Sequence, residues 1–209
     1  MKVKVCGMKY SENINQVAML NPDYMGFIFY KKSSRFVNEI VMTSQLKKLP
    51  KSIKKVGVFV NETRSEIETI SKKYKLDLIQ LHGDESPVFC ENLKEGKLKI
   101  IKAFQIDDQF NFSLLNEYEG TVDYFLFDTK SKSYGGSGRK FNWSLLSNYS
   151  YKTPFFLSGG INEKDISEIK KIKTLTIEAI DINSCFEISP ALKNIPKVSE
   201  FIKRVKNEL

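Results

Sequence analysis

The stretch "VDYFLFD" (122–128) joins an apolar run to a carboxylate, and both features bear on the fold. The run "YFLF" is apolar at successive positions, which is typical of a strand buried on both faces of a parallel sheet. In α/β proteins, active sites lie beyond the carboxyl ends of such strands. The stretch therefore predicts a buried parallel strand with Asp128 at the end where chemistry occurs.

Seven similar runs accompany it, and segments with helical periodicity separate them. The runs are "KVKVC" (2–6), "YMGFIF" (24–29), "KKVGVFV" (54–60), "LDLIQL" (76–81), "LKIIKAF" (98–104), "PFFLSG" (154–159) and "LTIEAIDI" (175–182). Eight strand–helix units predict an α/β fold, a (β/α)8 TIM barrel, as one domain spanning residues 1–209. A doubly wound open sheet is the alternative. The helix between the fifth and sixth strands has the weakest pattern.

Composition narrows the class of protein. Hydrophobic residues make up 41 % and charged residues 28 % of the 209 residues, as in soluble globular proteins. The three cysteines are far apart, and His82 is the single histidine, so we expect no disulfides and no metal site. With no pattern of a signal peptide or membrane span, we expect a cytoplasmic protein without a membrane partner.

The chain carries a formal net charge of +8, from 33 basic and 25 acidic residues. The excess is mostly lysine in helical surface patterns, with no arginine-rich stripe between aromatic residues. We therefore expect no nucleic-acid partner, although a basic nucleic-acid binder stays an alternative that salt-dependent binding would reveal. The positive charge can also steer an anionic substrate.

Reactive and polar residues gather at the expected strand ends. Cys6 and Asp128 end the first and sixth strands, across the barrel mouth from each other, where a thiol and a carboxyl can act as base and acid. Arg35 can grip a carboxylate, and His82 follows the fourth strand. A packed thiol, a turn carboxylate, a surface arginine and a loop histidine are the respective alternatives.

Glycines follow the sixth and seventh strands, in "YGGSGRKFNW" (134–143) and "SGGIN" (158–162). Glycine lets a backbone approach a ligand closely and present its N–H groups. Many barrels bind phosphate with the loops after the seventh and eighth strands. We therefore expect Gly159 and Gly160 to form a phosphate site, to which Ser184 adds a hydroxyl group.

Together these motifs resemble the phosphoribosylanthranilate isomerase family of tryptophan biosynthesis. The matching segments run in the family's order from residue 2 to about 193. They are "KVCGMK", "GFIFYKKSSRFV", "VGVFVNE", "IQLHGDE", "FDTKSKSYGGSGRKFNW", "FLSGGIN" and "AIDINSCFE". The set is specific, although no single member of it is.

The resemblance implies a cofactor-free Amadori rearrangement of a phosphosugar, N-(5-phosphoribosyl)anthranilate, from aminoaldose to aminoketose. Carried over by motif, Cys6 is the general base at C2 and Asp128 the general acid at the ring oxygen. Arg35 holds the anthranilate carboxylate, and His82 lines the site. The family resemblance leaves a monomer and a homodimer equally open.

The same resemblance assigns the phosphate site to Gly138, Gly159, Gly160 and Ser184, and it places Asp181 in the site at the end of the eighth strand. The chain departs from the family pattern in "NSCFEISPALKN" (183–194). The departures are Cys185 and Ala191, where glycines are expected, and Asn194, where an aspartate is expected. A positive φ at Cys185 would be strained, so we expect an altered phosphate site but intact catalysis.

Two other functions are alternatives to the isomerase. A barrel of the indole-glycerol-phosphate synthase type is expected to carry lysine and glutamates at its strand ends. Here Lys4 lies within a strand, and Asn61 and Gln105 stand at the third and fifth ends, which argues against it. A barrel that binds without catalysis would fit the altered eighth loop, but the presence of both Cys6 and Asp128 argues for an enzyme.

Overall fold

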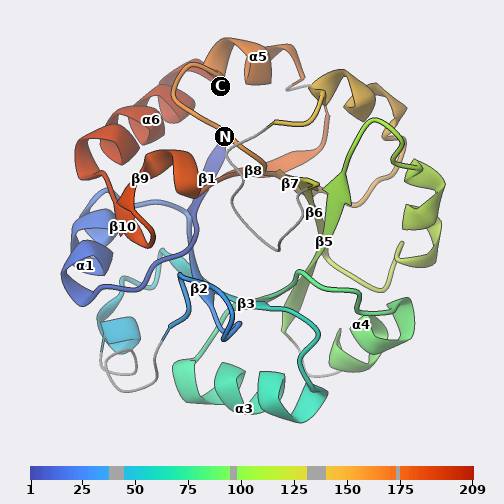
Figure 1. The fold of residues 1–209 in the computed structure, drawn as a ribbon, viewed down its shortest axis with the longest axis horizontal. Helices are drawn as coiled ribbons and strands as arrows, with labels where there is room; N and C mark the ends of the chain where they lie inside the picture. Colours follow the sequence, from blue (N-terminus) through green and yellow to red (C-terminus); the bar gives the residue numbers. More distant parts are fainter. Residues whose placement is uncertain (38–44, 95–97, 131–139, 173–174) are drawn as a thin grey trace.

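The computed structural model describes residues 1–37, 45–94, 98–130, 140–172 and 175–209. Eight parallel strands pair in chain order and close into a barrel. Figure 1 looks down the barrel, with the strands at the centre and the helices as an outer ring. The strands are β1 (Lys2–Val5), β2 (Tyr24–Ile28), β3 (Lys54–Phe59), β4 (Leu78–Leu81), β5 (Lys99–Ile106), β6 (Tyr124–Thr129), β7 (Phe155–Leu157) and β8 (Ile177–Ile182).

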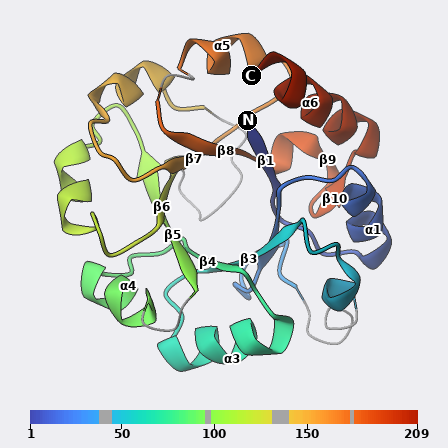
Figure 2. The same cartoon turned by 180° about the vertical axis from the view of Figure 1, so that it is seen from behind.

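The outer ring consists of α-helices and 3-10 helices. The α-helices are α1 (Ser11–Met19), α3 (Arg64–Tyr74), α4 (Pro87–Lys94), α5 (Ile166–Lys171) and α6 (Ile195–Glu208). The 3-10 helices are η1 (Phe112–Glu117), η2 (Trp143–Asn148) and η3 (Ser184–Phe186). A short antiparallel pair, β9 (Glu187–Ser189) and β10 (Leu192–Lys193), follows η3 and lies beside α1 and α6 in both views (Figures 1 and 2). None of the described helices is long and apolar enough to span a membrane.

The predicted (β/α)8 barrel is confirmed, and the open sheet is excluded because β1 pairs directly with β8. Each predicted strand overlaps its observed strand, and no strand end differs by more than two residues. The helices expected after β5 and β6 are 3-10 helices instead. The side chains of Asn111 and Asn142 accept N–H bonds from residues two positions ahead, and such tight Asx turns favour short 3-10 segments.

The interior of the barrel changes from apolar to polar toward the carboxyl ends of its strands. One layer of inward side chains is apolar: Tyr24, Val56, Leu78, Ile101, Ala103, Leu126, Phe156 and Ala179. Inward positions recur every second residue along a strand. The next inward positions on four of these strands are therefore Gln80, Asp128, Ser158 and Asp181. The apolar layer thus forms the base on which a polar site rests.

The segment that follows β8, residues 183–194, contains the three departures from the family pattern. Ala191 has φ +70°, so it occupies a left-handed position that favours glycine. Cys185 lies in η3 without a positive φ, so the strain expected at that position does not arise. Asn194 caps α6, because its side-chain oxygen accepts the Lys197 N–H at 3.1 Å. Aspartate and asparagine cap helices equally well.

We therefore predict that Asn194→Ala lowers the free energy of unfolding by about 1 kcal/mol, because the N–H of Lys197 loses its acceptor. Asn194→Asp is the matched control and should leave stability nearly unchanged. Urea denaturation followed by circular dichroism measures both. Equal losses for the two variants would contradict the capping interpretation.

Candidate active site

A pocket opens at the carboxyl ends of the strands, over the polar layer of the barrel. The space between its lining atoms is about 740 Å³, part of it open to solvent. All the described residues that the sequence predicted for the site line this pocket: Cys6, Arg35, His82, Asp128, Gly159, Gly160, Asp181 and Ser184. Gly138 lies outside the described residues.

Cys6 follows β1 directly and faces the pocket with 5 % of its surface exposed. Gly26 on β2 makes room for the thiol, because a Cβ there would lie 2.6 Å from the Cys6 Sγ. Burial raises the pKa of the Cys6 thiol above its ordinary value, and the charge of the nearby Lys4 ammonium offsets only part of this effect. The thiol faces the pocket, and a neighbouring cation favours its thiolate form.

Asp128 and His82 meet inside the pocket. The Asp128 Oδ2 and His82 Nε2 atoms are 3.4 Å apart, and both side chains are largely buried. The other oxygen of Asp128 accepts the Thr129 N–H at 2.8 Å, which fixes the carboxyl group. Asp128 is not the last residue of β6, as the sequence suggested, because the strand extends through Thr129. The carboxyl still lines the pocket, and a 3.4 Å contact can tighten when a substrate binds.

A chain of hydrogen bonds fixes the tautomer of His82. The Lys4 ammonium can only donate, and it donates to Gln80 Oε1 at 2.8 Å. The amide N–H₂ of Gln80 therefore faces His82 Nδ1, which lies 2.8 Å away and must accept. A neutral His82 then carries its proton on Nε2, the nitrogen that faces Asp128.

Lys4 and Asp181 form a buried ion pair beneath the pocket. Lys4 is fully buried in the barrel, and its Nζ lies 2.9 Å from Asp181 Oδ2. The pKa of Lys4 is raised: burial opposes its charge, but Asp181 and Cys6 outweigh this. The second oxygen of Asp181 is buried and has no hydrogen-bond partner among the described residues. That oxygen is available to a ligand in the pocket, which Asp181 lines.

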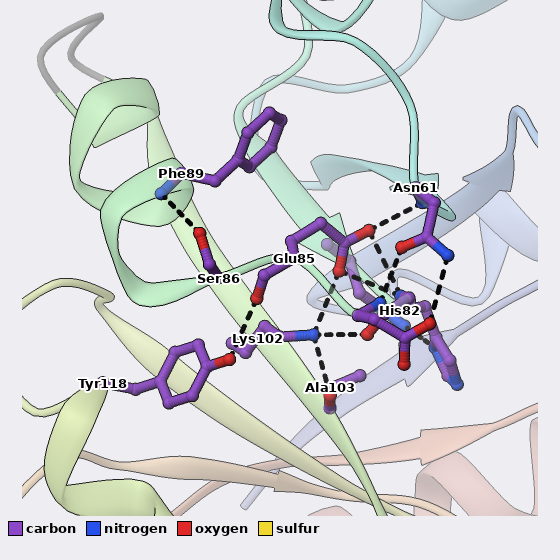
Figure 3. A network of polar contacts seen from close by, with 11 residues as sticks. Asn61, His82, Glu85, Ser86, Phe89, Lys102, Ala103 and Tyr118 are labelled. Carbon is purple, nitrogen blue, oxygen red and sulfur yellow. Dashed lines mark hydrogen bonds and ion pairs between the residues drawn. The ribbon is translucent and has the colours of Figure 1, made fainter.

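A second buried ion pair holds the loop that carries His82 (Figure 3). Lys102 on β5 binds Glu85 Oε2 at 3.0 Å and the carbonyl oxygen of Gly83 at 2.6 Å. Glu85 in turn accepts the backbone N–H groups of Gly83 and Asn61. The turn after β4 is thus bonded to Asn61, just beyond β3, and to Lys102 within β5, and this gives His82 a fixed position.

Arg35 reaches the pocket from the loop after β2. Glu187 holds its guanidinium, with Nε 2.9 Å from Oε1 and Nη2 2.7 Å from Oε2. Lys193 also binds Glu187 Oε1, at 2.5 Å. Burial raises the pKa of Glu187, but Arg35 and Lys193 together lower it below its usual value. The guanidinium is therefore oriented by a charged carboxylate, with further N–H groups left for a ligand.

The loops after β7 and β8 meet at the pocket. Gly159 and Gly160 both have positive φ, at 91° and 63°. A Cβ on Gly159 would lie 2.3 Å from Thr129 Oγ1, so only glycine fits there. The Cys185 Sγ lies 3.6 Å from the Gly160 carbonyl oxygen, and this contact links the two loops. Ser184 lines the pocket beside them.

Residues 3–204 match the family model of N-(5'-phosphoribosyl)anthranilate (PRA) isomerase. The chain belongs to the phosphoribosylanthranilate isomerase family. A curated isomerase of this family from Parabacteroides distasonis is 46 % identical over 206 residues, which cover 98 % of this chain and 93 % of that protein. The resemblance found in the sequence is therefore confirmed, and the chain is an isomerase of the tryptophan-biosynthesis family.

Solved structures of phosphoribosylanthranilate isomerases share the fold. One, in complex with reduced 1-(o-carboxyphenylamino)-1-deoxyribulose 5-phosphate, superimposes with a TM-score of 0.84 at 29 % identity, over 99 % of this chain and 98 % of that one. Another, of monomers made from the dimeric isomerase of Thermotoga maritima, superimposes with a TM-score of 0.83 at 30 % identity and the same coverage.

The motifs of the isomerase family predicted many of the residues that line the pocket. They did not predict the residues that hold Arg35 in position, nor all of the pocket lining. Glu187, which holds Arg35, and Lys193, which binds Glu187, were not predicted, and Asn183 and Ser158 also line the pocket. Counting every second residue inward along β7 could have found Ser158. The partners of Arg35 belong to the β9–β10 hairpin, which has no counterpart in the strand–helix repeat.

We predict that the neutral form of His82 carries its proton on Nε2, because Gln80 donates to Nδ1. His82 is the single histidine, so 15N–1H correlation spectra of its imidazole need no assignment. The spectrum of Gln80→Met should show a mixture of the two tautomers. A proton on Nδ1 in the unmodified protein would contradict the hydrogen-bond chain that begins at Lys4.

Proposed function

We propose that this chain catalyses the Amadori rearrangement of N-(5-phosphoribosyl)anthranilate to 1-(2-carboxyphenylamino)-1-deoxyribulose 5-phosphate. It would thus be an intramolecular oxidoreductase, an aldose–ketose isomerase that works without a cofactor. One observation carries the proposal: a single pocket contains a thiol, a carboxyl group, a held guanidinium and two left-handed glycines. This set matches a substrate with a carboxylate at one end and a phosphate at the other.

In the first step, Asp128 acts as the general acid. Its proton goes to the furanose ring oxygen, the bond between that oxygen and C1 breaks, and the nitrogen lone pair forms a C1=N bond. The resulting iminium ion makes the neighbouring C2–H acidic. His82, 3.4 Å from the Asp128 carboxyl, is placed to hold that group as its charge changes.

In the second step, the Cys6 thiolate takes the proton from C2. The C2–H electrons form a C1=C2 bond, the C=N electrons return to nitrogen, and the product is an enolamine. Ketonisation then moves the enol proton from oxygen to C1, which gives the aminoketose. A modest base suffices because the iminium has already weakened the C2–H bond, and proton transfers of this kind contribute about 10²- to 10⁴-fold each.

The two ends of the substrate hold the sugar between the acid and the base. Arg35, oriented by Glu187, would bind the anthranilate carboxylate with its remaining N–H groups. Gly159, Gly160 and Ser184 would bind the phosphate. The unpartnered oxygen of Asp181 would accept a hydroxyl of the sugar. Fixed anion grips at both ends convert the reaction into an oriented unimolecular one.

We also propose that residues 1–209 form one domain and that the protein works in the cytoplasm. Cys6, Cys90 and Cys185 are free thiols, as expected in a reducing compartment. Both a monomer and a homodimer are compatible with the proposal, and a similar isomerase from Thermotoga maritima is dimeric.

We predict that Cys6→Ser and Asp128→Asn each lower kcat for phosphoribosylanthranilate by at least about 10²-fold, because each removes a group that transfers a proton. The substrate is made in situ, and its consumption is followed by fluorescence. Cys90→Ala, which removes a thiol buried on α4 away from the pocket, is the matched control and should keep full activity. A folded wild-type protein without turnover would refute the proposed function and favour a barrel that only binds.

We further predict that Gly159→Ala raises KM on the order of tenfold and changes kcat less. A methyl group there would meet Thr129 and displace the loop that binds the phosphate, and tenfold corresponds to about 1.4 kcal/mol of binding. Inhibition by inorganic phosphate should weaken in parallel. An unchanged KM together with unchanged phosphate inhibition would show that the phosphate binds elsewhere.

A further inference from the structure

Lys4 is a buried charged group to which the proposed mechanism gives no task. It is fully buried inside the barrel, and its partners Gln80 and Asp181 line the pocket. Its ammonium donates two of its three N–H bonds, to Gln80 at 2.8 Å and to Asp181 at 2.9 Å. Lys4 and Cys6 are two residues apart at the end of β1, so both side chains point to the interior. The remaining N–H is the one that a neighbouring thiolate can accept.

Stability alone gives little reason for such an ion pair. Burying two charges costs about as much as their attraction returns, and apolar side chains of similar size are often as stabilising. The layer beneath Lys4 is in fact apolar, so a methionine would continue it. The location of the pair, directly below a reactive thiol, therefore points to an electrostatic function.

The charged groups around Cys6 act on its pKa in opposite directions and with different strengths. Burial raises the pKa of Cys6, and Lys4 is the strongest influence in the opposite direction, followed by Lys193. Asp181 raises the pKa, but less than Lys4 lowers it. The charged and titratable groups that face or surround the thiol are Lys4 on β1, Asp181 on β8, Lys193 on β10, Glu187 on β9, Arg35 after β2, and His82 and Asp128 across the pocket.

We propose that Lys4 is a positioning residue for the base: its ammonium, held by Asp181 and Gln80, stabilises the Cys6 thiolate that removes the substrate proton. The inference rests on the proposed function in one respect only, namely that the thiolate removes the C2 proton of the substrate. The pair acts with opposite signs, since Lys4 favours the thiolate and Asp181 disfavours it. If the ion pair were purely structural, losing either partner would disturb the site and would shift the pKa of Cys6 in the same direction.

The test measures the rate at which iodoacetamide alkylates Cys6 as a function of pH, with the label on each cysteine quantified by mass spectrometry. Lys4→Met should move the midpoint of the profile upward by about one pH unit, the effect of losing an adjacent opposite charge. Asp181→Asn should move it downward. Cys90, fully buried on α4, reports unfolding in the same samples if it becomes labelled.

Lys2→Met is the matched control. It also removes a lysine of β1 that is paired with a carboxylate of β8, Glu178 at 2.6 Å, but Lys2 is exposed and lies at the start of the strand, away from the pocket. The Cys6 profile of this variant should therefore match that of the wild-type protein. Shifts in the same direction for Lys4→Met and Asp181→Asn, no shift in either, or no reaction of wild-type Cys6 at any pH would each overturn the proposal.

Alkylation needs no substrate, so this test is independent of the proposed function. If the chain isomerises phosphoribosylanthranilate, the alkaline shift in Lys4→Met should also appear in the pH profile of kcat/KM, with recovery at high pH. If the signed alkylation shifts are present but turnover is absent, the function fails while the Lys4 inference stands. If turnover is present without the shifts, the proposed function stands and the Lys4 inference fails.

Discussion

The pairing of β1 with β8 closes the barrel and sets Lys4 directly opposite Asp181 in the strand register. This one constraint brings together residues that are 177 positions apart in the chain. Lys4 then reaches Gln80 on β4, and Gln80 reaches His82, which faces Asp128 on β6. The position of the thiol and the orientation of His82 therefore both depend on the closure of the sheet.

Two groups of charges surround the thiol, and they differ in construction. Lys4 and Asp181 lie inside the barrel, shielded from water, and act on Cys6 through a low-dielectric interior. Arg35, Glu187 and Lys193 belong to the loop after β2 and the hairpin after β8, and their network leaves guanidinium N–H groups for a ligand. The first group suits tuning of a proton transfer, and the second suits binding of an anion.

Local patterns were sufficient to predict the strands and the residues at their ends. An apolar run that stops at Cys6 or Asp128 is visible in one segment, and so is the glycine pair at 159–160. The partners of these residues were not predictable in the same way. Lys4 meets Gln80 across the barrel, and Arg35 meets Glu187 from a distant loop, so both contacts depend on the closed sheet. The tight turns begun by Asn111 and Asn142, which replaced two expected helices, depend on side-chain bonds that periodicity does not register.

In the proposed mechanism, one pocket holds both ends of the substrate and places its C1–C2 unit between Cys6 and Asp128. The decisive measurement is a crystal structure of this protein with reduced 1-(2-carboxyphenylamino)-1-deoxyribulose 5-phosphate. We expect the phosphate at Gly159, Gly160 and Ser184, the carboxylate at Arg35, and the Cys6 sulfur in contact with C2. A phosphate bound away from the two glycines, or a C2 atom out of reach of the thiol, would refute this arrangement.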